Sequence, residues 1–106
     1  MAREKFQTLT EQMFYILLCL RTELCGTDIM AQVSTLTKGR VSVGPGTLYN
    51  LLESFVQAGY IIETKVEGRK RSYLITEVGQ KALGDEYRRL RTLAADYEAQ
   101  TGKGGM

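Results

Sequence analysis

The fold is constrained most by residues 60–75, where the hydrophobic pattern of an otherwise helical chain changes to the pattern of β-strands. Two runs, residues 60–66 and 69–75, are rich in β-branched and aromatic residues and are separated by Glu67-Gly68, which predicts a β-hairpin. Glu-Gly is a weaker turn signal than Asn-Gly, so the loop can be wider than two residues. We therefore expect one hairpin among helices.

Three helices are expected before the hairpin. The first covers residues 10–23, where apolar residues recur at three- and four-residue steps. The second covers residues 28–37 and is capped by Thr27, and the third begins at Pro45, which suits the first turn of a helix. Gly59 is placed to end the third helix. Apolar residues at helical spacing form its expected buried stripe: Leu48, Leu51, Leu52, Phe55 and Val56.

A long helix is expected after the hairpin, from residue 77 to about residue 99, with Thr76 as its cap. Its apolar residues follow a 4-3-4-3 spacing, a heptad seam of about two repeats: Leu83, Tyr87, Leu90, Ala94 and Tyr97. Such a seam is too short for a free coiled coil but suits an arm docked on a second subunit. We predict that these residues form a dimer interface together with Phe14 and Leu18, which lie off the main apolar stripe of the first helix.

The order helix, helix, helix, hairpin and long helix defines the expected fold. The fold class is mostly α with a small β-hairpin (α+β), a winged helix-turn-helix with a long C-terminal dimerisation helix. We expect residues 1–79 to form the winged helix-turn-helix domain, residues 80–100 to form the dimerisation helix and residues 101–106 to form a flexible tail.

A winged helix-turn-helix places the N-terminal end of its third helix in the major groove of DNA, and its hairpin reaches the adjacent backbone. Asn50 can read adenine, and Thr47 can contact a base or a thymine methyl group. Gly46 leaves the helix N–H groups open to a phosphate, and basic residues supply the salt-dependent part of the affinity. We therefore predict double-stranded DNA as a partner, with these contact residues: Lys38, Arg40, Gly46, Thr47, Tyr49, Asn50, Arg69, Lys70 and Arg71.

Composition limits the other function classes. The chain of 106 residues carries a formal net charge of only +2, so the case for nucleic acid depends on where the charges lie. It has no histidine, which excludes a His-based acid/base pair or triad, and it lacks a Walker loop and a Rossmann glycine fingerprint. We expect no enzyme activity, no metal and no cofactor. No apolar run approaches about 20 residues, so we expect no membrane span and a cytoplasmic location.

Cys19 and Cys25 are the only cysteines. If both were helical, they would lie roughly 9 Å apart along the helix axis, which is too far for an unstrained disulfide. The favoured interpretation is a small buried apolar residue for Cys19 and an inert thiol at a helix end for Cys25. A redox-sensing pair is the alternative.

Four stretches of the chain form a recognisable set: Leu9 to Val33, Gly46-Thr47-Leu48-Tyr49-x-Leu51-Leu52, Gly59-Tyr60-Ile61 and Tyr73-Leu74-Ile75-Thr76-x-x-Gly79. Over about residues 9–83, they resemble the PadR family of bacterial transcriptional regulators. The resemblance implies a homodimer, a palindromic operator, and repression that a small molecule or a stress signal relieves. It also implies that Tyr49 contacts the DNA backbone. The single C-terminal helix resembles the smaller PadR subgroup, in which that helix packs on the partner's first helix.

Two alternatives stay open. A winged helix that binds protein instead of DNA would carry an acidic or apolar face on its third helix, and Glu53 and Glu63 favour it slightly. A small hydrophobic effector could bind at the dimer interface. The chain has no tryptophan, so other aromatic residues would line that cavity or simply pack the interface: Phe14, Tyr15, Tyr87 and Tyr97.

Overall fold

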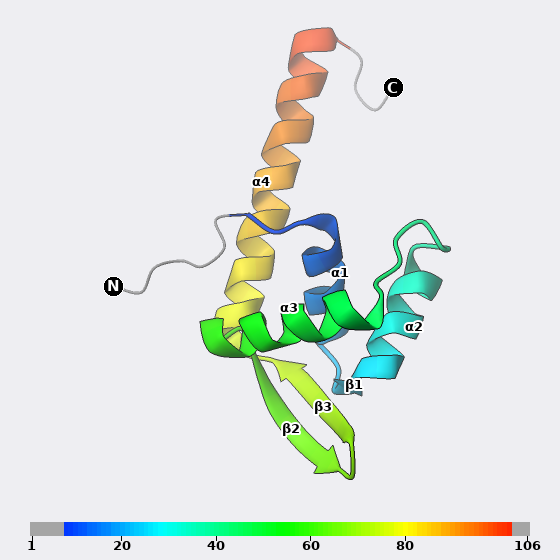
Figure 1. Ribbon diagram of the computed structural model, residues 1–106. Coiled ribbons are helices and arrows are strands. Elements are labelled where there is room, and N and C mark those ends of the chain that lie inside the picture. The colour runs from blue at the N-terminus through cyan, green and yellow to red at the C-terminus, as the bar shows by residue number, and fades with distance from the viewer. Residues whose placement is uncertain (1–7, 103–106) are drawn as a thin grey trace.

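The computed structural model describes residues 8–102 and confirms an α+β chain, with four helices and one small antiparallel sheet in this range (Figure 1). In chain order the elements are α1 (Glu11–Cys19), β1 (Leu24–Cys25), α2 (Gly26–Leu36), α3 (Pro45–Ala58), β2 (Ile61–Glu67), β3 (Lys70–Ile75) and α4 (Glu77–Thr101). The predicted order of three helices, a hairpin and a long helix is therefore confirmed. Thr101, which the prediction assigned to a flexible tail, belongs to α4, and residues 103–106 lie outside the described residues.

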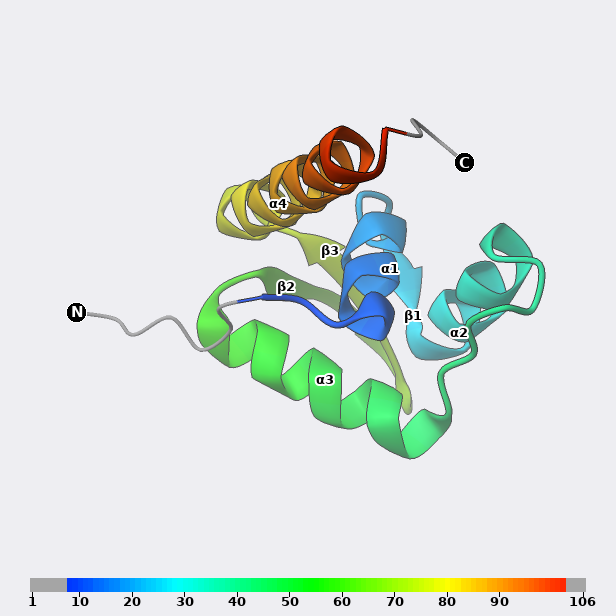
Figure 2. The same cartoon turned by 90° about the horizontal axis from the view of Figure 1, so that it is seen from above.

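The core lies where the first three helices meet the base of the sheet. α1 sits at the centre, with α2, α3 and α4 around it (Figure 2). The largest fully buried side chains are all apolar: Phe55, Ile16, Leu17, Leu20, Ile29, Leu48, Leu52, Ile61 and Val33. Each contributes about 1.5–3 kcal/mol when it is removed from water, so this cluster holds α3 and the base of the hairpin in a fixed relation.

The buried stripe of α3 is narrower than the sequence predicts. Leu48, Leu52 and Phe55 are buried, but Leu51 is half-buried and Val56 is 42% exposed. The prediction for Val56 was wrong because this side chain lines an open pocket between α3 and the hairpin instead of the core.

The segment after α1 also departs from the prediction. α1 ends at Cys19 and not at residue 23, and Leu24–Cys25 forms a short strand that pairs antiparallel with β3. The sheet therefore has three strands in the order β1-β3-β2. The Ile75 N–H also donates to the Leu20 carbonyl at 2.8 Å. The physical reason for the difference is that the open edge of β3 offers backbone groups that need partners.

α2 begins earlier than its predicted cap. Cys25 takes the N-cap position, and its side chain makes no capping hydrogen bond. Thr27 lies inside the first turn, with its hydroxyl oxygen 3.4 Å from the Cys25 sulfur. The prediction of a Thr27 cap was wrong because the pairing of β1 with β3 sets where the helix begins.

The predicted hairpin is confirmed, with the start of each strand shifted by one residue. β2 and β3 pair antiparallel as far as Glu67 and Lys70, so the loop contains only two residues, Gly68 and Arg69. Gly68 has a φ of 64°, in the left-handed region that two-residue hairpin loops favour. Arg69 therefore lies in the turn and not in the strand.

The start of α4 is as predicted and joins the end of α3. The Thr76 hydroxyl accepts a hydrogen bond from the Gly79 N–H at 3.1 Å and donates one to the Gly59 carbonyl at 2.6 Å. Gly79 packs so closely on Tyr60 that an added Cβ would lie 2.9 Å from the Tyr60 carbonyl carbon, and closer still to its oxygen. This junction therefore admits no side chain at position 79.

Only the first part of α4 packs on the rest of the protein. Leu83 belongs to the core, and the buried Glu86 pairs with Arg89 and accepts a hydrogen bond from the Leu9 N–H at 3.3 Å. The hydrogen bond from Arg89 is the main cause that lowers the pKa of Glu86 below its ordinary value. Every described residue beyond Glu86 is exposed, and this part of α4 extends well away from the other elements (Figure 1). Although α4 is 25 residues long, no helix within residues 8–102 has both the length and the apolarity to cross a membrane.

The Gly79 junction gives a first prediction. Gly79→Ala should lower the free energy of unfolding by about 1–3 kcal/mol, because the new Cβ meets backbone that cannot move aside easily. Urea denaturation followed by circular dichroism measures this change. Gly84→Ala is the matched control, because its Cβ would meet only the guanidinium of Arg88, at 3.5 Å. Equal stability of the two variants would contradict the packing described for this junction.

Candidate nucleic-acid interface

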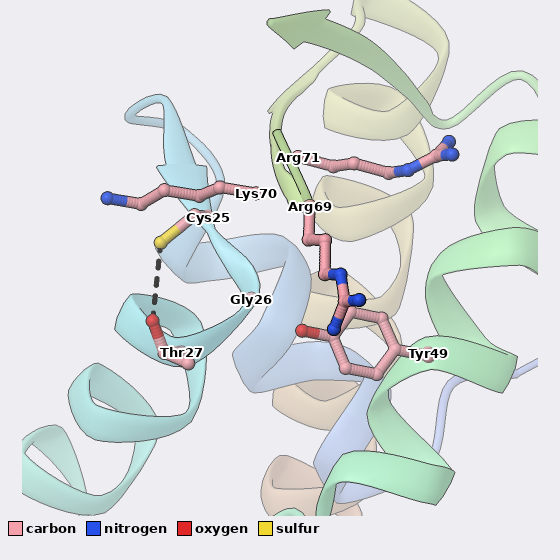
Figure 3. A pocket seen from close by; sticks show the side chains of 7 residues that line it. All are labelled: Cys25, Gly26, Thr27, Tyr49, Arg69, Lys70 and Arg71. Carbon is pink, nitrogen blue, oxygen red and sulfur yellow. Dashed lines mark hydrogen bonds between the residues drawn. The ribbon is translucent and has the colours of Figure 1, made fainter. Parts of the chain in front are cut away.

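Three segments that are distant in the sequence meet at one pocket, here called the wing pocket. It has a volume of about 430 Å³ and lies between the start of α2, the side of α3 and the turn end of β3 (Figure 3). Its lining residues are Cys25, Gly26, Thr27, Tyr49, Arg69, Lys70 and Arg71. The structure thus brings together four of the residues that the sequence predicts as DNA contacts: Tyr49, Arg69, Lys70 and Arg71.

The wing, which consists of β2, β3 and their turn, spreads its three consecutive cations. In Figure 3 the Arg69 side chain runs toward the Tyr49 ring, whereas Lys70 runs toward the side of α2 where Cys25 lies. Arg71 points away from both. Within residues 8–102, neither Arg69 nor Lys70 forms an ion pair. These two charges are therefore available to an anionic partner.

Arg71 differs from its two neighbours because it pairs with an acid of its own hairpin. Its guanidinium lies 3.3 Å from the Glu63 carboxylate on β2. The Arg71 side chain is 59% exposed and that of Glu63 only 32%. Exposed ion pairs of this kind are weak, about 0–1 kcal/mol, so the pairing restrains Arg71 without burying it. It also cancels much of the negative charge that Glu63 would bring to this surface.

The first turns of α3 present polar groups outward. Pro45 occupies the start of the helix, and no side chain within residues 8–102 caps it. Gly46, Thr47 and Asn50 are all exposed. The free N–H groups of this end and the side chains of Thr47 and Asn50 are therefore open to a ligand. Whether they contact DNA stays a prediction.

Tyr49 lies at the wing pocket and is held from one side by α2. Its side chain is 47% exposed, and its hydroxyl points toward Gly26 at the start of α2 (Figure 3). A Cβ on Gly26 would come within 2.8 Å of the Tyr49 ring carbon that bears the hydroxyl. The sequence does not reveal this contact, because nothing in the local pattern links Gly26 to a residue on α3.

Arg40, a predicted DNA contact in the connector between α2 and α3, binds to side chains of α1. The Arg40 guanidinium donates to the Tyr15 hydroxyl at 2.8 Å, lies 5.9 Å from the centre of that ring, and is 3.9 Å from Glu11. Arg40 therefore ties the connector to α1, a role that the sequence did not reveal. Lys38 is exposed and has a φ of 55°, so the chain turns sharply there.

A second pocket, of about 370 Å³, lies on the other side of Tyr49. It is lined by Tyr49, Leu52, Glu53, Val56, Glu63, Arg71 and Tyr73. Burial first, and then the nearby Glu63 carboxylate, raise the pKa of Tyr73 above its ordinary value, so this phenol stays protonated at neutral pH. With two carboxylates in its lining, this pocket is less suited to an anion than the wing pocket is.

The two cysteines lie in different elements. Cys19 ends α1, whereas Cys25 is in β1 and takes the N-cap position of α2, so it lies at a helix end as predicted. Both are buried, and both are free thiols. Burial is the main cause that raises the pKa of the Cys19 thiol, which keeps it protonated and unreactive at neutral pH.

The residues predicted for a dimer interface fall into three groups. Leu83 packs in the protomer's own core, and Phe14 and Leu18 are half-buried against that core. The other four lie on the exposed part of α4: Tyr87, Leu90, Ala94 and Tyr97. Leu93, which the heptad spacing missed, is also exposed there. The far part of α4 therefore carries an apolar face, here called the α4 face, that no other described helix or strand covers.

Comparison with known proteins gives a family and a fold. Residues 16–85 match the PadR-like family of transcriptional regulators. A search of curated protein sequences finds no match.

Solved structures share the fold at low sequence identity. The structure of RosR from H. salinarum superposes with a TM-score of 0.64 at 23% identity, over 89% of this chain and 97% of that one. A transcriptional regulator from Clostridium thermocellum superposes with a TM-score of 0.72 at 19% identity, over 84% of this chain and 90% of that one. The complex structure hsRosR-S1 superposes with a TM-score of 0.62 at 23% identity, over 88% of this chain and 95% of that one.

The ion pair of Arg71 gives a second prediction. Glu63→Gln frees Arg71, so the affinity for a random-sequence DNA duplex at low salt should rise about twofold to fivefold, as expected for an exposed ion pair. Fluorescence anisotropy measures the affinity. Glu67→Gln removes the same charge from the same hairpin, but Glu67 has no ion pair within the described residues. An equal rise in both variants would mean that only net charge matters and that the pairing does not restrain Arg71.

Proposed function

The chain belongs to the PadR-like family of transcriptional regulators, which are not enzymes, and we propose that it acts by binding a palindromic DNA operator as a homodimer. The observation that supports DNA binding most is the wing pocket. There Arg69 and Lys70, which form no ion pair within the described residues, line the pocket together with Tyr49, next to the exposed first turns of α3. A positively charged groove beside a free helix end matches the negative backbone of a duplex.

The proposal assigns base reading to α3 and backbone contact to the wing. The major groove of B-DNA, about 12 Å wide, admits one helix, and α3 has its polar groups at the end that would enter first. Asn50 would read adenine and Thr47 a base edge or a thymine methyl group. Arg69, Lys70 and Arg71 would contact phosphates beside the groove, and Gly46 lets the helix end approach one. Lys38 and Arg40 would lie at the backbone ahead of the reading helix.

The homodimer part of the proposal rests on the α4 face. The described residues of α4 beyond Glu86 are all exposed, so this part lacks the packing that stabilises most protein helices. Large apolar groups gathered on it favour burial against a partner. A second copy is the natural partner, because a two-fold dimer brings two α3 helices to two half-sites of a palindrome. Repression and release by a small hydrophobic effector stay predictions that rest on the family resemblance, and a cytoplasmic location stays a prediction.

A salt titration tests DNA binding. The affinity for a random-sequence duplex should fall linearly with salt on logarithmic axes, with a slope of about −0.9 for each phosphate contact. Arg69→Ala with Lys70→Ala should weaken binding to all sequences and make the slope shallower. Lys81→Ala with Arg88→Ala is the matched control, because it removes two cations that pair with Asp85 on α4. Absence of wild-type binding at low salt would refute the proposal and favour a protein-binding winged helix.

Lysine substitutions test the dimer. Leu90→Lys with Ala94→Lys places two charges in the α4 face, so the protein should become a monomer in analytical ultracentrifugation at micromolar concentration. Ala95→Lys with Ala99→Lys has the same spacing but lies on the opposite side of the helix, and this control should stay dimeric. A dimer that survives the first pair of substitutions would show that α4 is not the interface.

A further inference from the structure

Gly26 has a steric role that its backbone conformation does not require. It is the first residue of α2 and is buried. The described glycines with positive φ are Gly39, Gly59, Gly68 and Gly102, so the conformation at position 26 is open to any residue. Glycine is needed there only for space, since an added Cβ would lie 2.8 Å from the ring carbon that bears the Tyr49 hydroxyl, and 3.0 Å from the next ring carbon.

The group that occupies this space is the hydroxyl end of the Tyr49 side chain, which comes from another helix. Tyr49 comes from α3, and its hydroxyl lies against the start of α2 at the wing pocket, beside Arg69 (Figure 3). The side chain is 47% exposed, so without the contact to Gly26 it could adopt other rotamers. Because Gly26 has no side chain, the Tyr49 hydroxyl can lie against the start of α2. This contact sets its position relative to the cations of the wing.

We propose that Gly26 is a positioning residue of the DNA interface, which seats the Tyr49 hydroxyl beside Arg69 at the wing pocket so that both side chains can meet the phosphate backbone. The proposal rests on the DNA-binding function proposed above. It assigns a role to a residue that would not itself touch DNA. The contact also connects α2 to α3 at the point where both would face the duplex.

Gly26→Ala is the direct test, and the variant is expected to fold. The atoms that its Cβ would meet are the outer end of a half-exposed side chain, which can swing outward, and alanine suits a helix better than glycine does. Affinity for a random-sequence duplex should fall about tenfold, as for loss of a hydrogen bond to a charged group. Because the substitution removes no cation, the salt slope should stay that of the wild type, whereas displacement of the wing cations would make it shallower.

A double-mutant cycle separates positioning from a general loss of structure. Tyr49→Ala removes the phenol, so Gly26→Ala should have no further effect on DNA affinity in that background. Tyr49→Phe should lose about as much affinity as Gly26→Ala, because both remove the hydroxyl from its place. Gly84→Ala on α4 is the matched glycine control and should bind as the wild type does. If Gly26→Ala failed to fold, Gly26→Ala with Tyr49→Ala should fold, since the clash is then gone.

The outcomes divide clearly. If the wild-type protein binds DNA and Gly26→Ala binds it with the same affinity, the positioning role is overturned and the proposed function stays intact. Equal losses from Gly26→Ala in the wild-type background and in the Tyr49→Ala background would also overturn it, because the effect would not pass through the phenol. An unfolded double variant would do the same. A wild-type protein that binds no duplex at low salt would refute the proposed function, and the positioning role with it.

Discussion

The arrangement of the whole site depends on the pairing of β1 with β3. This short ladder, with the hydrogen bond from Ile75 to the Leu20 carbonyl, ties the chain between α1 and α2 to the second strand of the wing. Because α2 begins directly after β1, the pairing also fixes Gly26 next to the wing. A two-residue strand adds little buried area. Its pairing nevertheless sets the position of the start of α2 relative to Tyr49 and the wing.

The cations of this surface divide into two kinds. Arg71 is paired with Glu63 and Arg40 is bound to Tyr15 and Glu11, so both hold parts of the fold in place. Arg69 and Lys70 form no ion pair within the described residues. The division explains how a chain with a formal net charge of only +2 can offer a local positive site, because placement and pairing, not total charge, set the local potential.

α4 joins the two halves of the proposed function. Its first turns pack on the rest of the protein through the close contact of Gly79 with Tyr60 and through the buried Glu86. The direction of α4 is therefore fixed relative to the other elements. Its far turns expose the α4 face. A partner bound there would therefore stand in a fixed relation to α3 and the wing. This rigid connection is what a dimer needs if the spacing of its two reading helices is to match two half-sites.

The sequence by itself determined the kind and order of the four helices and of the hairpin. Helical spacing in α3, the cap Thr76 and the turn at Gly68 are local signals, and local physical chemistry is enough to read them. Only the tertiary structure decided which of these residues meet. The β1 strand, the exposure of Val56 and the space that Gly26 leaves for Tyr49 all depend on contacts between segments distant in the chain, and no local pattern encodes them.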